Sequence, residues 1–404
     1  MMNQSDWKNK TIRFLTAQTV SLFGSSLVQY AIVWYITLST SSGKMLTIST
    51  LCGFVPQIVI SLFAGVWVDR YERKKLIMFS DSIIAAATLV LAAAFLAGYR
   101  NIWFLFAVLI VRSAGTGIQT PAVNAVLPQI VPREHLMRVN GINSTLTSLT
   151  MFLSPAVSGA ILSAAPLEAT LFIDVVTAVI GVAVTSTVSI PLHRENRVTG
   201  ASGLRDIREG FAYLKEHAMI RRLMLFQIVV LFLISPSAFL TPLLVSRTFG
   251  QEVWRLTASE MTYSLGMILG GLLITAWGGF KKKLNTTLAA GAFYGALMLG
   301  LGLAPVFAVY LLFNLLIGIT SPCYNTPITV TIQEQVEQGM QGRVFSLMQI
   351  STSCALPLGM ALFGPAADYV RVQQLLLAAG VLVILITIYM AVCRRFDRTD
   401  GSGA

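Results

Sequence analysis

Long uncharged stretches constrain this chain more than any other feature. Seven windows contain no Asp, Glu, Lys or Arg, at residues 14–43, 45–68, 139–167, 223–246, 261–280, 344–367 and 372–393. Residues 284–333 are charge-free over enough length for two spans, and 76–99, 101–132 and 169–193 carry one charge each. Because a helix needs roughly 20 apolar residues to cross about 30 Å of hydrocarbon, these windows predict an all-α integral membrane protein with twelve transmembrane helices.

Composition supports this fold class and excludes others. Of the 404 residues, 55% are hydrophobic and only 12% are charged, which is far less charge than a soluble domain carries. The net charge of +11 does not indicate a nucleic-acid partner, because the basic residues fall in short segments between apolar runs. The spans are continuously apolar and do not alternate, which excludes a transmembrane barrel. The four cysteines show no metal or disulfide spacing, and no metal or cofactor is expected.

The basic residues predict the orientation. All but six of the 29 Lys and Arg lie on one side of the predicted spans, the side that also holds both termini. The six are Lys44, Arg100, Arg112, Arg247, Arg255 and Arg371, of which Arg112 lies inside a span. Because cytoplasmic loops carry the excess of Lys and Arg, both termini are expected in the cytoplasm.

A repeated octapeptide predicts the domain organisation. GIQTPAVN at 117–124 and GITSPCYN at 318–325 share the pattern G-I-x-[TS]-P-x-x-N, about half the chain apart. Two similar six-span halves around a pseudo-twofold axis are how one class of secondary transporter is built. We therefore expect an N-terminal six-helix half (1–192), a central cytoplasmic loop (193–222) and a C-terminal six-helix half (223–404). Within the loop, LRDIREGFAYLKE at 204–216 has the apolar spacing of an amphipathic helix.

A charged segment between the second and third spans carries a family pattern. Residues 65–75 read GVWVDRYERKK, which resembles the motif G-x-x-x-D-R-x-G-R-[RK] of the major facilitator superfamily. The matching residues are Gly65, Asp69, Arg70, Arg73 and Lys74, while Glu72 replaces the second glycine. With the twelve spans, the 6+6 layout and the long central loop, the resemblance covers essentially the whole chain.

Other motifs resemble the drug:proton antiporter branch of that family. Where the branch has G-P-x-x-G-G in span 5, this chain has SPAVSG at 154–159, so Pro155 and Gly159 match and serine twice replaces glycine. TPAVNAV at 120–126, ID at 173–174, GGLL at 270–273 and GRVFSL at 342–347 are similar to macrolide-efflux proteins. The resemblance implies a multi-pass protein of a bacterial cell membrane that exports lipophilic drugs in exchange for protons, as a monomer.

Asp69 is the residue of the charged motif that needs an explanation. It ends span 2 on the cytoplasmic side, where the helix dipole disfavours an anion by about 0.3–1 kcal/mol. The resemblance implies that Asp69 contacts the N-terminus of span 11 and acts as a gate. The alternative, which we favour for Glu72, is a surface ion pair with neighbouring cations.

Buried charges are the candidates for proton coupling. Arg112 in span 4 and Asp174 in span 6 lie at depths that differ by only about 6 Å in upright helices, so they are expected to reach each other. We consider Asp174 as the proton carrier with Arg112 as its sensor, and a static structural pair as the alternative. Asp81 is a second candidate, with a position turned toward Arg73 or a neighbouring loop as the preferred alternative.

Two further acids have simpler interpretations. The sequence TASE at 257–260 has the capping-box pattern, so Glu260 is interpreted as a helix cap and secondarily as a proton site. Asp368 is expected to form a surface pair with Arg371.

The substrate cavity is expected near the midplane, as in related folds. Polar and aromatic residues within apolar spans are its candidates: Gln29, Tyr30, Gln119, Asn124, Gln227, Tyr324 and Asn325. Asn124 and Asn325 are stronger candidates because they occupy equivalent positions in the repeated octapeptide. The aromatic residues are weaker candidates, because an aromatic side chain more often packs between helices than contacts a ligand. The prolines of spans 4, 5, 10 and 11 predict kinks.

No enzyme class is indicated, because the chain has no P-loop and no nucleotide-binding domain. A proton gradient is the expected energy source. The alternatives to drug export are export of a siderophore or other metabolite, inward transport on the same fold, or a non-transporting membrane sensor or scaffold.

Overall fold

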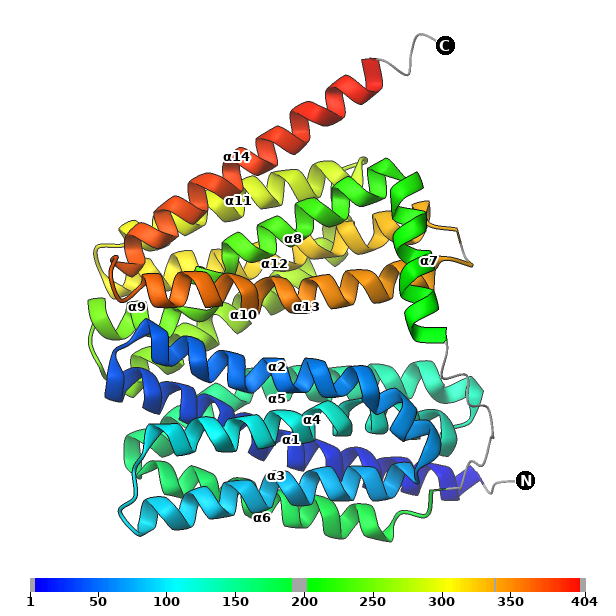
Figure 1. Cartoon of the computed structure of the whole chain (residues 1–404), viewed down its shortest axis with the longest axis vertical. Helices are drawn as coiled ribbons and strands as arrows, with labels where there is room; N and C mark the ends of the chain where they lie inside the picture. The colour runs from blue at the N-terminus through cyan, green and yellow to red at the C-terminus, as the bar shows by residue number, and fades with distance from the viewer. Residues whose placement is uncertain (1–3, 191–201, 338, 400–404) are drawn as a thin grey trace. The chain divides into compact units, whose positions relative to one another are not determined.

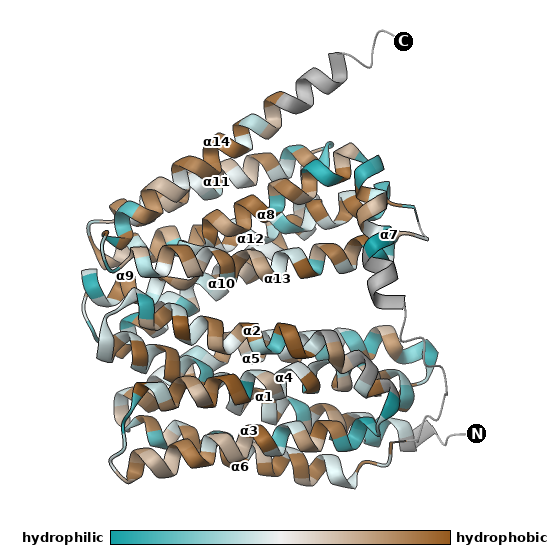
Figure 2. Cartoon of the chain, in the orientation of Figure 1, coloured by the Kyte–Doolittle hydropathy of each residue, from teal (hydrophilic) through white to brown (hydrophobic). Residues whose placement is uncertain are grey.

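The apolar windows form long helices. In the computed structural model, which describes residues 4–190, 202–337 and 339–399, no strand occurs and eleven helices are long and apolar enough to cross a membrane. Figure 2 shows the hydrophobic residues running along helices such as α6 (Leu167–Thr187) and α14 (Val372–Thr399). The predicted eighth span corresponds to α10 (Val253–Trp277), which is not among the eleven because its first half is rich in polar residues. The number twelve therefore stays a prediction.

One unit comprises residues 1–40 and 48–199 and holds the helices from α1 to α6 (Figure 1). Beside α6, these are α1 (Gln4–Thr40), most of α2 (Gly43–Arg70), α3 (Arg73–Leu96), α4 (Ile102–Ile130), the short η1 (Arg133–His135) and α5 (Leu136–Ala164). Helices α1 and α3 each pack against both α4 and α6. Side chains from α1 to α5, including Phe14, Val68, Ile77, Val126 and Val139, form a buried core near one end of these helices. This packing positions the interior faces of α1, α3, α4 and α6 toward one another.

The second unit comprises residues 41–47 and 200–404. Its helices are α7 (Ser202–Glu216), α8 (Ala218–Phe239), α9 (Thr241–Thr248), α10, α11 (Lys283–Leu303), α12 (Phe307–Gln335), α13 (Gln341–Ala366) and α14. Helix α10 packs on α12, and α11 packs on both α12 and α14. The first turn of α2 belongs to this unit, although the rest of α2 belongs to the other. The expected halves, 1–192 and 223–404, stay a prediction, and no sequence feature indicated this division of α2.

The glycines of the repeated octapeptide occupy corresponding positions. A Cβ atom on Gly117 of α4 would lie 2.8 Å from the Gln57 carbonyl oxygen of α2. A Cβ atom on Gly318 of α12 would lie 2.3 Å from the Tyr263 carbonyl oxygen of α10. Both glycines thus permit a helix pair to approach at backbone distance, as small residues do in membrane helices. The resemblance between the two octapeptides therefore extends to how they pack.

The amphipathic helix predicted in the central loop is confirmed as α7. It packs against α13, with Gly210, Tyr213 and Leu214 buried and Phe211 exposed. Glu209 forms an ion pair of 2.9 Å with Arg343 at the start of α13. The helical spacing predicts Phe211 and Leu214 on the apolar face; Leu214 is buried as expected, whereas Phe211 is exposed and Tyr213 is buried instead. The beginning of the loop, 191–201, lies outside the described residues.

The predicted span 223–246 is interrupted. Helix α8 ends at Phe239 and α9 begins at Thr241, with Pro236 inside α8 and Pro242 in the first turn of α9. Proline lacks the N–H that would continue the backbone ladder, which accounts for the break. In contrast, Pro121, Pro155, Pro322 and Pro357 lie inside continuous helices α4, α5, α12 and α13, and their kinks stay predictions.

Candidate functional site

Arg112 of α4 and Asp174 of α6 form an ion pair inside the first unit. The Arg112 guanidinium donates to Asp174 Oδ2 and to the Thr88 hydroxyl. Asp174 also accepts hydrogen bonds from Ser25 Oγ at 3.1 Å and Thr88 Oγ1 at 2.9 Å. Asp174 is 0% exposed and Arg112 is 5% exposed. The expectation that these two residues reach each other is confirmed, and the buried charge pair has the hydrogen bonds that such a pair requires.

Asp81 of α3 is a second buried acid, and it is only 2% exposed. Its Oδ1 accepts hydrogen bonds from Ser21 Oγ at 2.8 Å and Gln119 Nε2 at 2.6 Å. No described residue donates to its Oδ2. The preferred interpretation, in which Asp81 turns toward Arg73 or a loop, is therefore wrong. Asp81 faces Ser21 of α1 and Gln119 of α4, while Arg73 donates to the Ala125 carbonyl at 2.7 Å.

Helices α1 and α4 each provide a hydrogen-bond partner to both buried acids. On α1, Ser21 binds Asp81 and Ser25 binds Asp174, and residues four apart are one turn apart on the same helix face. On α4, Gln119 binds Asp81 and Arg112 binds Asp174, about two turns apart. A continuous polar seam therefore runs through the first unit along α1 and α4. The serines were not predicted, although hydroxyls at helical spacing opposite a buried acid were the available signal.

A cavity of about 550 Å³ opens beside this seam. Ser25, Arg112 and Gln119 form part of its wall, so each buried acid has a hydrogen-bond partner that also faces the cavity. Gln29, Gln119 and Asn124, three of the predicted substrate residues, lie on this wall. The volume lies within the range of small-molecule sites. Arg112 is the one charged residue among the described residues that line the cavity.

The second unit has its own cavity of about 450 Å³. Its wall includes the predicted Gln227 and Asn325 together with Phe345, Met348 and Leu356. None of the described residues that line it is charged. The Gln227 side-chain oxygen is buried and has no partner in the described chain. The two asparagines of the repeat, Asn124 and Asn325, thus each line the cavity of their own unit.

Two predicted aromatic residues lie elsewhere. Tyr30 neighbours Trp34, with ring centroids 5.7 Å apart, and is outside the walls of both cavities. Tyr324 is 3% exposed and its ring lies 6.2 Å from that of Phe226. Its hydroxyl has no partner among the described residues. The Tyr324 ring thus packs between α12 and α8, whereas the ring neighbour of Tyr30 lies one turn along the same helix α1.

The sequence pattern that describes the Major Facilitator Superfamily matches residues 14–360. The chain belongs to the major facilitator superfamily. One relative is macrolide efflux protein A of Streptococcus pyogenes, which is 32% identical over 403 residues, covering 99% of this chain and 100% of the relative. Another is the staphyloferrin A transporter of Staphylococcus aureus, which is 22% identical and is covered over 94% of its length, with 93% of this chain aligned. The chain is therefore a membrane transporter and not an enzyme.

Solved structures of this superfamily share the fold. A bacterial homologue of the human lysosomal transporter Spinster, in an inward-facing and unoccupied conformation, superposes with a TM-score of 0.73. The superposition covers 97% of this chain and 98% of the other, at 12% sequence identity. At that identity the likeness concerns the fold alone.

The charged motif of the superfamily is held by backbone contacts in the first unit. Arg73 donates to the Ala125 carbonyl of α4. Lys74 donates to the Ser186 and Val188 carbonyls at the end of α6, at 2.6 and 2.9 Å, where a cation complements the helix dipole. These two cations therefore bind backbone groups of the protein.

The structure describes the remaining residues of the charged segment to different extents. Glu72 pairs with Lys75 at 2.9 Å, which confirms the surface ion pair expected for it. Arg70 ends α2 and is exposed. Gly65 and Asp69 lie in α2, but the side chain of Asp69 is outside the described residues. The gate role of Asp69 therefore stays a prediction.

The antiporter motif of the superfamily packs α5 against α1. Pro155 and Gly159 are buried in α5. Between them, Ser158 donates from its hydroxyl to the Leu27 carbonyl of α1 at 3.1 Å. This serine, where the branch has glycine, adds a hydrogen bond between the two helices at a point of close contact.

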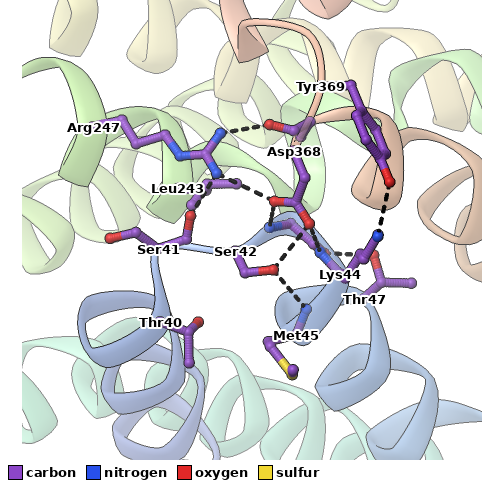
Figure 3. A network of polar contacts seen from close by, with 12 residues as sticks. Thr40, Ser41, Ser42, Lys44, Met45, Thr47, Leu243, Arg247, Asp368 and Tyr369 are labelled. Atoms are coloured by element: carbon purple, nitrogen blue, oxygen red, sulfur yellow. Dashed lines mark hydrogen bonds and ion pairs between the residues drawn. The ribbon is translucent and has the colours of Figure 1, made fainter.

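A polar network at the start of α2 was not predicted (Figure 3). The Asp368 carboxylate, between α13 and α14, accepts hydrogen bonds from the backbone N–H groups of Gly43 at 2.6 Å and Lys44 at 3.0 Å, and from Ser42 Oγ at 2.9 Å. Asp368 also pairs with Arg247 of α9 at 3.3 Å. The expected pairing of Asp368 with Arg371 is therefore wrong, because the unpaired N–H groups of a helix N-terminus bind an anion more favourably.

The network fixes the ionised form of Asp368. Burial alone raises the pKa of this carboxyl group. The donors from Lys44, Gly43 and Ser42 and the charge of Arg247 outweigh burial, so that the pKa lies below its ordinary value. The available signal was the Ser-Ser-Gly sequence at 41–43, because serine and glycine are typical of the residues that precede a helix.

Proposed function

We propose that this transporter exports lipophilic, macrolide-like drugs in exchange for protons, by alternating access. The observation that carries the proposal is the dual contact of Arg112 and Gln119. Each lines the cavity of the first unit, and each also holds a buried carboxylate, Asp174 or Asp81. A ligand that displaces either side chain therefore changes the environment of an acid, and protonation of an acid changes the cavity wall.

The chemistry of the cavity walls favours a neutral or lipophilic substrate. Amide and hydroxyl side chains predominate in the first cavity, and the second combines amide and hydroxyl side chains with apolar ones. Arg112, the single charged residue on the described walls, is already neutralised by Asp174. Hydrogen-bonding groups set among apolar surfaces suit a large ligand with scattered hydroxyl and carbonyl groups. The similarity to macrolide efflux protein A supports the same substrate class.

The proton-coupling group comprises Asp81, Asp174 and Arg112. Asp174 accepts three hydrogen bonds, from Ser25, Thr88 and its cationic partner Arg112, whereas one oxygen of Asp81 has no described donor. A protonated carboxyl group donates a hydrogen bond and so suits a position where an oxygen lacks a donor. The Asp81 side of the seam is therefore the proposed entry point of the proton, and Asp174 with Arg112 responds to it. The proton gradient supplies the energy, and no cofactor is required.

The proposal also covers the orientation of the protein in the membrane and the residues that gate its substrate path. Both termini and the charged motif lie on the cytoplasmic side of a bacterial cell membrane, following the distribution of Lys and Arg. Asp69 acts as a gating residue there, with Gly65, Arg70, Arg73 and Lys74. The protein works as a monomer.

Export of an anionic siderophore is the second candidate, favoured by the similarity to the staphyloferrin A transporter. An anionic substrate requires uncompensated cations on the path, and the described cavity walls offer none. A non-transporting sensor or scaffold is the candidate from a different class.

Inverted membrane vesicles with an imposed pH gradient test these candidates. Addition of erythromycin as the macrolide probe is expected to release protons from acid-loaded vesicles that contain the protein, and not from vesicles that lack it. Proton release by a carboxylate siderophore with none by erythromycin would favour the second candidate. No proton movement with either probe would contradict the proposal.

A further inference from the structure

Glu260 of α10 is an acid in the second unit that the coupling group above does not use. It lies on the wall of a cavity of about 90 Å³. The same wall contains Ser237, Tyr263, Tyr294 and Asn314, from α8, α10, α11 and α12. Glu260 is only partly exposed. An acid at such a place requires an explanation, because ionisable residues within membrane bundles are costly and usually functional.

The cap interpretation of Glu260 is wrong. Helix α10 begins at Val253 with Glu252 at the N-cap position, so Glu260 lies about two turns inside the helix. Thr257, the other member of the supposed capping box, donates its hydroxyl to the Val253 carbonyl within the helix. The carboxylate therefore does not satisfy a helix terminus, and its position must serve another purpose.

No cation of the described chain neutralises Glu260. The described wall of the cavity holds no Lys, Arg or His. The basic residues of the neighbouring helices have other partners: on α10 Arg255 pairs with Glu252 at 2.8 Å, on α9 Arg247 pairs with Asp368, and at the start of α11 Lys283 pairs with Glu334. The basic residues of α8, Arg221 and Arg222, lie at the opposite end of that helix from Ser237. The titratable groups that face Glu260 are the phenols of Tyr263, Tyr294 and Tyr310.

The polar neighbours of Glu260 are engaged with one another. Tyr310 shares a hydrogen bond of 2.7 Å with the Ser259 hydroxyl, and Asn314 Nδ2 donates to the Ser259 carbonyl at 2.7 Å. Tyr294 shares a contact of 3.4 Å with the Ser237 hydroxyl. These contacts preorganise a polar shell around the carboxyl group without providing it with a counter-charge.

We propose that Glu260 is a second proton-binding group of the transporter, located in the C-terminal unit and independent of Asp81 and Asp174. An ionised carboxylate without a counter-charge is strongly disfavoured away from water, and uptake of a proton removes that cost. The group therefore holds a proton while its cavity is closed and releases it when the cavity opens to water. The cavity has space for about three water molecules, which provide the route for the proton. This role extends the proton exchange proposed above.

Infrared difference spectroscopy of the purified full-length protein in lipid nanodiscs tests the proposal without any drug. The carboxyl C=O band of a protonated side chain is recorded at neutral pH for the wild type, Glu260→Gln and Glu252→Gln. Glu252 is the matched control, because it is an acid of the same helix that pairs with Arg255. We expect the band to lose intensity in Glu260→Gln and to be unchanged in Glu252→Gln. Glu260→Asp is expected to shift the band instead of removing it. This variant provides a second test of the proposal if the glutamine variant folds poorly.

Two results would overturn the proposal. Identical carboxyl bands in the wild type and Glu260→Gln from pH 5 to pH 8 would mean that Glu260 stays ionised. Loss of the wild-type band when choline chloride is replaced by sodium chloride would mean that an alkali cation occupies the site instead. Neither result bears on whether erythromycin moves protons in vesicles, so failure of this inference is distinguishable from failure of the proposed function. In the vesicle assay, Glu260→Gln is expected to lower the ratio of protons to drug.

Discussion

Arg112 of α4 and Asp174 of α6 are 62 residues apart in the sequence and share one buried ion pair. The substitution Asp174→Asn leaves a buried guanidinium without its counter-charge. Breaking a buried pair in this way typically costs about 3–5 kcal/mol. We expect a lower thermal unfolding temperature of the purified protein in detergent and loss of proton-driven export.

The double variant Arg112→Gln with Asp174→Asn separates structure from coupling. Removing both charges eliminates the unpaired ion, so stability is expected to recover by more than half of the loss seen in Asp174→Asn. Export is expected to remain absent, since the contact of Gln119 with Asp81 persists but no charged pair is left to respond to protonation of Asp81. Full export by either variant would refute the coupling role of this pair and would mean that the ion pair only stabilises the packing of α4 and α6.

Gly270 and Gly271 provide an internal comparison in α10. A Cβ atom on Gly270 would lie 2.2 Å from the Ile319 carbonyl oxygen of α12, whereas one on Gly271 would meet no atom within 4 Å. Gly270→Ala is expected to destabilise the protein by about 1–3 kcal/mol through overpacking. Gly271→Ala is expected to leave stability unchanged or raise it slightly, as Ala favours a helix over Gly. Equal unfolding temperatures of the two variants would contradict the close contact of α10 with α12.

The Asp368 network predicts a defined pH dependence. Because the pKa of Asp368 in the folded protein is lowered, its contribution to stability is fully present above the unfolded value of about 3.9. That contribution is lost as the pH falls through the lower folded value. Asp368→Asn is therefore expected to lower the unfolding temperature at pH 7, with a difference from the wild type that shrinks below about pH 4. A difference that is constant from pH 7 to pH 3 would indicate that the charge of Asp368 is irrelevant.

Asn124 and Asn325 test the two cavities separately. Substitution of either by leucine removes hydrogen-bonding groups from a wall and fills part of the cavity. The loss of a hydrogen bond to substrate is worth about 0.5–1.5 kcal/mol, so we expect KM for erythromycin export to rise several-fold. Tyr30→Phe, outside both walls, is the control and should leave KM unchanged. If Asn325→Leu alone has no effect, the substrate path lies in the first unit.

The gate role of Asp69 is tested by charge reversal. Asp69→Lys is expected to abolish export while membrane insertion and yield stay normal. Glu72→Lys is the matched control, since Glu72 forms an exposed pair with Lys75, and such pairs contribute little. If both variants export at the wild-type rate, the charged motif contributes through Arg73 and Lys74 alone.

The sequence by itself determined the membrane class, the approximate spans and the family. Each depends on properties that are local along the chain: an uncharged apolar run must form a helix in lipid, and a repeated octapeptide such as 117–124 needs no three-dimensional information to be seen. The pairing of Arg112 with Asp174 also followed, because two buried opposite charges at similar depth have few other partners.

Only the tertiary structure decided which neighbours the polar residues have. Helix rotation places Asp81 against Ser21 and Gln119 rather than Arg73, and it removes Tyr30 and Tyr324 from the cavity walls. A rotation of one residue, about 100° around a helix axis, changes such contacts without altering hydropathy. Likewise, Asp368 meets the start of α2 only because distant segments fold together, and the described residues around Glu260 offer it no counter-charge because the helices that meet there bring none.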